Sequence, residues 1–153
     1  MGGRRARGGF DVFISYRREG GAFAARLLFE RLGRDGLRVF LDVDLLKSGR
    51  FDSKLLRQIQ SATNFVLVLS EGSLERCRLR DDWLRREVSH AIHCGRNIIP
   101  ILMPGFGWPK ESRLPPDLRR LPSYNGIIYE HEHFDGVIEQ LHQFLRIGPD
   151  RLA

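Results

Sequence analysis

Residues 64–69 read Asn-Phe-Val-Leu-Val-Leu, a run with five successive apolar side chains. A short run of this kind is typical of a strand at the centre of a parallel sheet, where both faces of the strand are covered. Similar runs at 10–16, 37–42 and 97–103 predict three more strands, and residues 125–129 predict a weaker fifth. The sequence therefore predicts a sheet of five strands.

Apolar residues at helical spacing predict an amphipathic helix after most of these strands, at 22–32, 51–61, 81–92 and 134–145. We expect Gly33 and Gly36 to end the first helix, and Gly95 to end the third. Strands that alternate with helices indicate an α/β fold, a flavodoxin-like, doubly wound parallel sheet with right-handed crossovers. Pro100 cannot donate a ladder hydrogen bond, so we expect its strand at an edge or a bulge.

The composition is that of one globular domain. The 153 residues are 42% hydrophobic and 29% charged, with a net charge of +6. Arg4, Arg5 and Arg7 supply three of these charges, which leaves the rest too weakly basic for a dedicated nucleic-acid binder. We expect residues 1–9 to be a flexible basic arm or a cloning remnant, residues 10–147 to form the domain, and residues 148–153 to be a tail.

The cysteine content and the hydropathy predict the compartment. The two cysteines, Cys77 and Cys94, lack the spacing of a zinc ribbon or a disulfide framework. No apolar run approaches the ~20 residues that cross a bilayer, and the start lacks the apolar centre of a signal peptide. A reducing, cytoplasmic setting without a membrane span is the expectation.

The helix at 81–92 carries the best catalytic candidates. Leu84, Val88 and Ala91 belong to its apolar stripe, and Trp83 and Glu87 lie one helical turn apart on the shoulder of that stripe. An indole beside a carboxylate at this position suits catalysis. The alternative is an aromatic residue that helps the core and a solvated glutamate.

In doubly wound sheets, ligands bind outside the carboxyl ends of the strands. The residues expected at that edge are Tyr16, Arg17, Arg18, Asp42, the loop 43–50 with Gly49, Phe51, Ser70, Trp83 and Glu87. Neither a dinucleotide-binding glycine motif nor a P-loop is present. A phosphate-accepting response regulator would need an aspartate where Ser70 stands. His90, His93 and Cys94 lack a further ligand at convincing spacing, so no metal site is expected.

Several stretches together resemble the TIR (Toll/interleukin-1 receptor) domain family. They are Phe-Asp-Val-Phe-Ile-Ser-Tyr-Arg-Arg (10–18), Phe-Leu-Asp-Val-Asp-Leu-Leu-Lys-Ser-Gly-Arg-Phe (40–51), Asn-Phe-Val-Leu-Val-Leu-Ser (64–70), Asp-Trp-Leu-Arg-Arg-Glu (82–87) and Cys-Gly-Arg-Asn-Ile-Ile-Pro-Ile (94–101). Within that family the chain looks most like the branch found in NAD hydrolases with sterile-alpha and armadillo motifs, which act in axon degeneration and innate immunity.

The resemblance implies cleavage of the nicotinamide–ribose bond of NAD+, giving nicotinamide with ADP-ribose or cyclic ADP-ribose, with base exchange as a further reaction. NAD+ is then the substrate, and no cofactor is implied. By position, Glu87 matches the catalytic glutamate of the family, and Trp83 matches an aromatic that stacks on the dinucleotide. Arg17 and Arg18 would hold the pyrophosphate or brace a neighbouring subunit.

The resemblance also implies homotypic assembly through the loop 43–51, in which Gly49 and Phe51 match the family's BB loop. The alternative function is a non-enzymatic TIR signalling adaptor, and a glutamate at position 87 beside a tryptophan favours the enzyme. Two features depart from the family pattern: Lys47 replaces an acidic residue, and the stretch between Cys77 and Trp83 is about two residues shorter.

Overall fold

A computed structural model describes residues 9–41 and 53–147 of the chain. Its centre is a parallel sheet of five strands in the order β2-β1-β3-β4-β5, which is the flavodoxin-like order. The strands are β1 (Val12–Tyr16), β2 (Val39–Leu41), β3 (Asn64–Leu69), β4 (Asn97–Leu102) and β5 (Ile127–Ile128). The predicted fold class and number of strands are confirmed.

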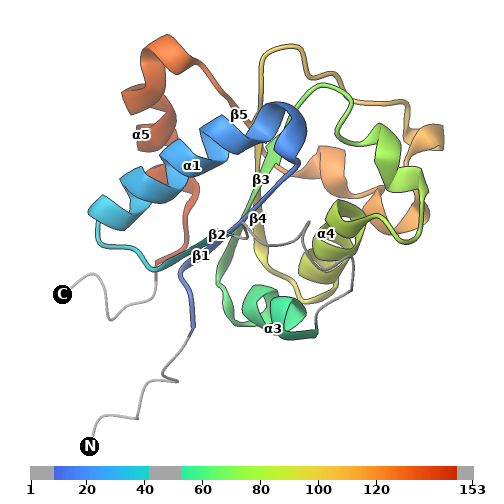
Figure 1. Cartoon of the computed structure of the whole chain (residues 1–153), viewed down its shortest axis with the longest axis horizontal. Helices are drawn as coiled ribbons and strands as arrows, with labels where there is room; N and C mark the ends of the chain where they lie inside the picture. Colours follow the sequence, from blue (N-terminus) through green and yellow to red (C-terminus); the bar gives the residue numbers. More distant parts are fainter. Residues whose placement is uncertain (1–8, 42–52, 148–153) are drawn as a thin grey trace, which may run out of the picture.

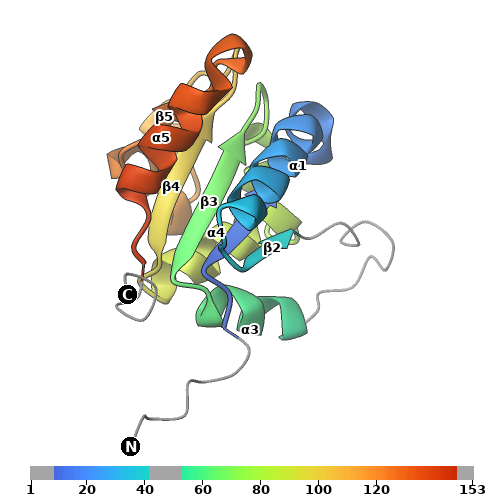
Figure 2. The same ribbon diagram turned by 90° about the vertical axis from the view of Figure 1, so that its left-hand side faces the viewer.

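Helices cover both faces of the sheet (Figures 1 and 2). Helices α1 (Arg18–Arg34) and α5 (Phe134–Phe144) lie on one face, and α3 (Ser53–Ser61) and α4 (Trp83–His93) lie on the other. Short 3-10 helices occupy the loops: η1 (Glu75–Arg78), η2 (Glu111–Arg113), η3 (Pro116–Leu118), η4 (Leu121–Ser123) and η5 (His131–His133). In the described part of the chain, no helix combines the length and the apolar character that crossing a membrane requires.

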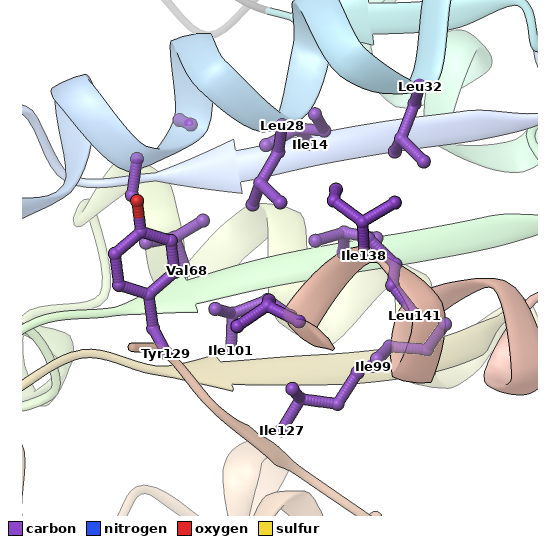
Figure 3. Packing of buried hydrophobic residues seen from close by; sticks show 14 of the residues in the cluster. Ile14, Leu28, Leu32, Val68, Ile99, Ile101, Ile127, Tyr129, Ile138 and Leu141 are labelled. Atoms are coloured by element: carbon purple, nitrogen blue, oxygen red, sulfur yellow. The ribbon is translucent and has the colours of Figure 1, made fainter. Parts of the chain in front are cut away.

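All six residues of β3 are buried, as predicted for a central strand. Because successive side chains of a strand point to opposite faces, β3 contributes to two cores. Val66 and Val68 belong to the cluster under α1 and α5, whereas Phe65, Leu67 and Leu69 belong to the cluster under α3 and α4. Figure 3 shows side chains of the first cluster from α1, α5 and the strands pointing toward one another.

The expectation for Pro100 is wrong, because β4 lies inside the sheet, between β3 and β5. Asn97 donates its N–H to the Thr63 carbonyl, and Met103 donates its N–H to the Leu69 carbonyl. The N–H groups of odd-numbered residues along β4 therefore point toward β3, and the backbone nitrogen of Pro100 points away from it. On that side β5 pairs with β4 only from Ile101 onward. The missing N–H of Pro100 therefore breaks no ladder hydrogen bond.

Helix α1 is longer than predicted at both ends. Gly33 lies within it, and the chain turns instead at Gly36, which has φ = 91°. At the other end Glu19 and Gly20 interrupt the helical backbone, and Gly20 has φ = 79°. The Ser70 hydroxyl at the end of β3 donates to the Glu19 carbonyl at 2.8 Å, which brings Gly20 against Ser70.

A polar network ties the end of α5 to the amino ends of two strands. The buried Asn64 side chain donates to the Arg146 carbonyl at 2.8 Å and accepts from the Arg146 N–H at 2.9 Å. Asn97 donates to the Asn64 side chain at 2.7 Å and to the Phe144 carbonyl at 2.9 Å. Backbone groups that follow α5 are satisfied in this way without further secondary structure.

Two glycines in α1 should respond oppositely to alanine. A Cβ at Gly20 would lie 2.9 Å from the Ser70 Cβ and would require a positive φ, so Gly20→Ala should lower the free energy of unfolding by about 1–3 kcal/mol. A Cβ at Gly33 meets nothing within 4 Å, so Gly33→Ala should raise it by about 0.5–1 kcal/mol. Urea denaturation measures both, and a stable Gly20→Ala protein would contradict the packing described.

Candidate active site

Helix α4 begins at the carboxyl edge of the sheet, directly after the loop that follows β3. The Asp82 side chain caps it by accepting the Arg85 N–H at 2.9 Å. Leu84, Val88 and Ala91 are buried against the sheet, which confirms the predicted apolar stripe. Positive φ at Gly95 follows the C-terminal end, as expected.

Glu87 is buried on this helix, with only 1% of its surface exposed. The alternative of a solvated glutamate is therefore wrong, and the expected shoulder position was too shallow. The reason is that α4 packs against β1, so this strand buries the helix face that carries Glu87. A carboxylate in such a place carries a desolvation cost, and buried carboxylates of this kind concentrate at functional sites.

The group on β1 that meets Glu87 is Ser15. Its hydroxyl donates to Glu87 Oε1 across 3.3 Å, and Ser15 is itself only 1% exposed. Sequence reasoning missed this residue. A signal was available, because Phe13 and Ser15 share a strand face and Phe13 belongs to the core under α3 and α4. A lone hydroxyl on the apolar inner face of a strand indicates a polar partner.

Trp83 lies one turn before Glu87 and is half-buried. It packs against the core cluster under α3 and α4, which confirms the prediction that this aromatic residue helps the core. Structure alone thus gives Trp83 a packing role and leaves its stacking role as a prediction.

Arg17 is held by the protein rather than presented to a ligand. Its two terminal nitrogens reach both oxygens of Asp82 at 2.8 Å, its Nε donates to the Ser73 carbonyl at 2.6 Å, and only 11% of its side chain is exposed. Burial disfavours the charged form, but the hydrogen bonds and charge of Asp82 outweigh it and raise the pKa of Arg17. In this arrangement Arg17 joins β1 to the start of α4, a position that does not offer its fork to a pyrophosphate.

Cys77 lies beside this ion pair, with its Sγ 3.5 Å from both Arg17 Nη2 and Asp82 Oδ2. Burial and the neighbouring Asp82 carboxylate raise the pKa of its thiol to about 12. The thiol therefore stays protonated at neutral pH, which makes Cys77 a packing residue and not a nucleophile.

The remaining predicted residues fall into three groups. Arg18 is exposed on the first turn of α1, at the expected edge. Tyr16 also reaches that edge, but it packs with the core under α1 and α5, on the opposite face of the sheet from Ser15 and Glu87. Asp42, Gly49 and Phe51, with the rest of the loop 43–50, lie outside the described residues.

Metal binding has little geometric support. His90 Nε2 lies 3.5 Å from Cys94 Sγ, but across residues 9–41 and 53–147 no three histidine, cysteine, aspartate or glutamate side chains are grouped to hold an ion. Glu87 is the buried carboxylate around which the candidate site is built.

A family model described as TIR domain matches residues 12–145. The chain is 44% identical over 140 residues to "NAD(+) hydrolase sarm1" of Drosophila melanogaster, covering 89% of this chain and 10% of that protein. It is 40% identical over 146 residues to "NAD(+) hydrolase SARM1" of Danio rerio, covering 94% of this chain and 20% of the relative. The Caenorhabditis elegans protein "NAD(+) hydrolase tir-1" is 42% identical over 139 residues, covering 88% and 14% respectively.

Solved structures share the fold at lower identity. The TIR domains of the activated Roq1 resistosome superpose with a TM-score of 0.62 at 17% identity, over 88% of this chain and 98% of that one. A TIR-STING receptor from C. gigas, solved with 2',3'-cGAMP, has a TM-score of 0.61 at 21% identity, over 90% and 40%.

The chain spans 10–20% of the length of the curated relatives it matches, so it corresponds to one domain of those proteins. The family model accounts for every described strand and every described helix. On this evidence the chain belongs to the TIR domain family.

Proposed function

We propose that this domain cleaves the nicotinamide–ribose bond of NAD+, with Glu87 as the catalytic residue. The observation that carries the proposal is a carboxylate that is 1% exposed, held by a buried serine hydroxyl at the carboxyl edge of a parallel sheet. The names of relatives at 40–44% identity, all of them NAD(+) hydrolases, support the same substrate.

The chemistry suits a site with one carboxylate. Nicotinamide is already quaternised in NAD+ and leaves as a neutral base, so it needs no general acid, unlike the leaving sugar oxygen that a glycosidase must protonate. The bond to the anomeric carbon breaks, the electron pair departs with nicotinamide, and positive charge develops on the ribose. Glu87 would hold a ribose hydroxyl and stabilise that charge in a partly dehydrated site.

The neighbouring residues take supporting roles in this proposal. Trp83, which is half-buried, would stack on a ring of the dinucleotide. Arg18, which is exposed at the start of α1, would hold the pyrophosphate, whereas Arg17 would act by holding α4 against β1 through Asp82. Asp42, Gly49 and Phe51 stay predictions for the same pocket, and water or a ribose hydroxyl completes the reaction to ADP-ribose or its cyclic form.

We also propose that several copies act together, through the loop 43–51, in the cytoplasm. Two observations bear on this. The activated Roq1 resistosome is an assembly that contains TIR domains with this fold, and both cysteines of the present chain are free, which suits a reducing compartment. Microscopy of a fluorescently tagged protein checks the compartment.

Replacing Glu87 tests the catalytic role. Nicotinamide release from NAD+ by concentrated protein, followed by chromatography, should fall about 10²–10³-fold in Glu87→Gln, because the amide cannot stabilise positive charge. The matched control is Glu71→Gln, which alters an exposed carboxylate after β3 at the same edge. Equal release by wild type and Glu87→Gln would contradict the proposal. No release by wild type would instead support a non-enzymatic adaptor.

Ser15 should act as a positioning residue for Glu87. Ser15→Ala removes one hydrogen bond to the carboxylate and should lower kcat about tenfold while KM changes little, because the lost contact orients the catalytic group rather than the substrate. Ser15→Thr retains a hydroxyl and serves as the rescue variant. A thermal melt separates this effect from unfolding, and unchanged kcat in Ser15→Ala would show that the contact is dispensable.

Assembly should appear as a dependence of specific activity on protein concentration. If two copies complete one pocket, nicotinamide released per molecule rises as the protein is concentrated and is raised further by tethering domains on a surface, which increases effective concentration. The measurement is a dilution series at fixed NAD+. Constant specific activity across the series would indicate that a single copy is sufficient.

A further inference from the structure

A hollow of about 390 Å³ lies at the edge of the sheet opposite to Glu87. It is bordered by the C-terminal end of α4, the start of β4, the segment around η4 and Arg146, two residues after the end of α5. The side chains that matter here are those of Arg96, Arg120, Arg146, Ser123 and Tyr124. Gly95, on its border, follows the C-terminal end of α4 and is eight residues after Glu87 in the sequence.

Three arginines, Arg96, Arg120 and Arg146, line this hollow, and none of its lining residues is acidic. Several other arginines of the described structure do pair with carboxylates, for example Arg85 with Asp117 at 3.0 Å and Arg86 with Asp81 at 2.9 Å. No carboxylate of the described residues lies within 4.0 Å of Arg96, Arg120 or Arg146. Like charges that gather without a counter-charge repel one another, so this cluster needs an explanation.

Helix ends account for only one of the three. The C-terminal ends of helices carry partial negative charge and attract cations. Arg96 meets that demand for α3 and α4, because it donates to the carbonyls of Gln60, Ala62 and Cys94 at 3.0–3.3 Å. The Phe144 carbonyl at the end of α5 accepts from Asn97. The guanidinium groups of Arg120 and Arg146 therefore remain in excess of what the helix ends require.

The backbones that carry the two excess arginines are held in place. Asn64 binds both the N–H and the carbonyl of Arg146, and the Ser123 hydroxyl donates to the carbonyl of Arg120. Both side chains are exposed, so they reach the hollow from fixed anchor points. A site with fixed anchors loses less entropy when it captures a ligand.

We propose that this hollow binds a soluble compound that carries two or more adjacent phosphate groups. The planar guanidinium fork matches phosphate oxygens, and the ligand would supply the negative charge that the cluster lacks. The Tyr124 side chain lines the same hollow and offers a hydroxyl donor and an aromatic edge. The proposal is independent of the reaction at Glu87, because the two sites lie at opposite ends of the strands.

The probe is inorganic pyrophosphate, titrated into ¹⁵N-labelled protein at 0.15 M salt and followed by NMR. We expect saturable shifts of the amides of Gly95, Ser123, Tyr124 and Arg146. The double variant Arg120→Ser/Arg146→Ser should bind at least about tenfold more weakly, since it loses two charge-assisted hydrogen-bond donors. The matched control Arg34→Ser/Arg57→Ser removes the same charge from exposed positions outside the hollow and should bind as wild type does.

Four results would overturn the proposal. Shifts confined to residues 15–18 would assign pyrophosphate to the candidate active site instead. If both double variants bound pyrophosphate equally weakly, the cause would be a general effect of net charge. The same would hold if sulfate bound as tightly as pyrophosphate. Co-sedimentation with vesicles of phosphatidylcholine and phosphatidylinositol bisphosphate, with no response to free pyrophosphate, would assign the hollow to a lipid headgroup.

Discussion

The burial of β3 on both faces is the constraint on which the rest of this domain depends. Six residues without exposed surface require one layer of helices on each side, and a parallel neighbour on each edge requires crossover connections. The chain therefore leaves β3 at the carboxyl edge and returns through α4. That return path brings the N-terminal half of α4 beside β1, which is why Glu87 meets Ser15.

Charge burial then distinguishes the two ends of the sheet. At the carboxyl edge, Arg17 and Asp82 form a largely buried ion pair in which their charges neutralise each other. The Glu87 carboxylate at the same edge accepts a hydrogen bond from the Ser15 hydroxyl. Burying the Glu87 carboxylate lowers the stability of the fold, and a local cost of this kind is common at active sites. At the amino edge, Arg96 satisfies helix carbonyls while Arg120 and Arg146 stay exposed. These differences underlie the two proposals, catalysis at the carboxyl edge and anion binding at the amino edge.

Most of the fold could be predicted because its signals are local. The run at 64–69 matches β3 residue for residue, and the apolar stripe of α4 is the buried one. Pro100 was misjudged because its effect depends on which neighbour its missing N–H would face, a matter of sheet order. That Ser73 and Asp82 engage Arg17 could not be predicted, because these partners lie 56 and 65 residues away in the sequence.

The sequence by itself determined the class of fold, the residues of the core and the identity of Glu87 and Trp83 as candidates, because periodicity and family motifs are properties of neighbouring residues. Only the tertiary structure decided that Glu87 is buried rather than solvated, that Ser15 holds it, and that Arg17 is engaged by Asp82. These facts arise from the packing of α4 against β1, two elements that are separated by more than sixty residues of chain and meet only when the sheet has formed.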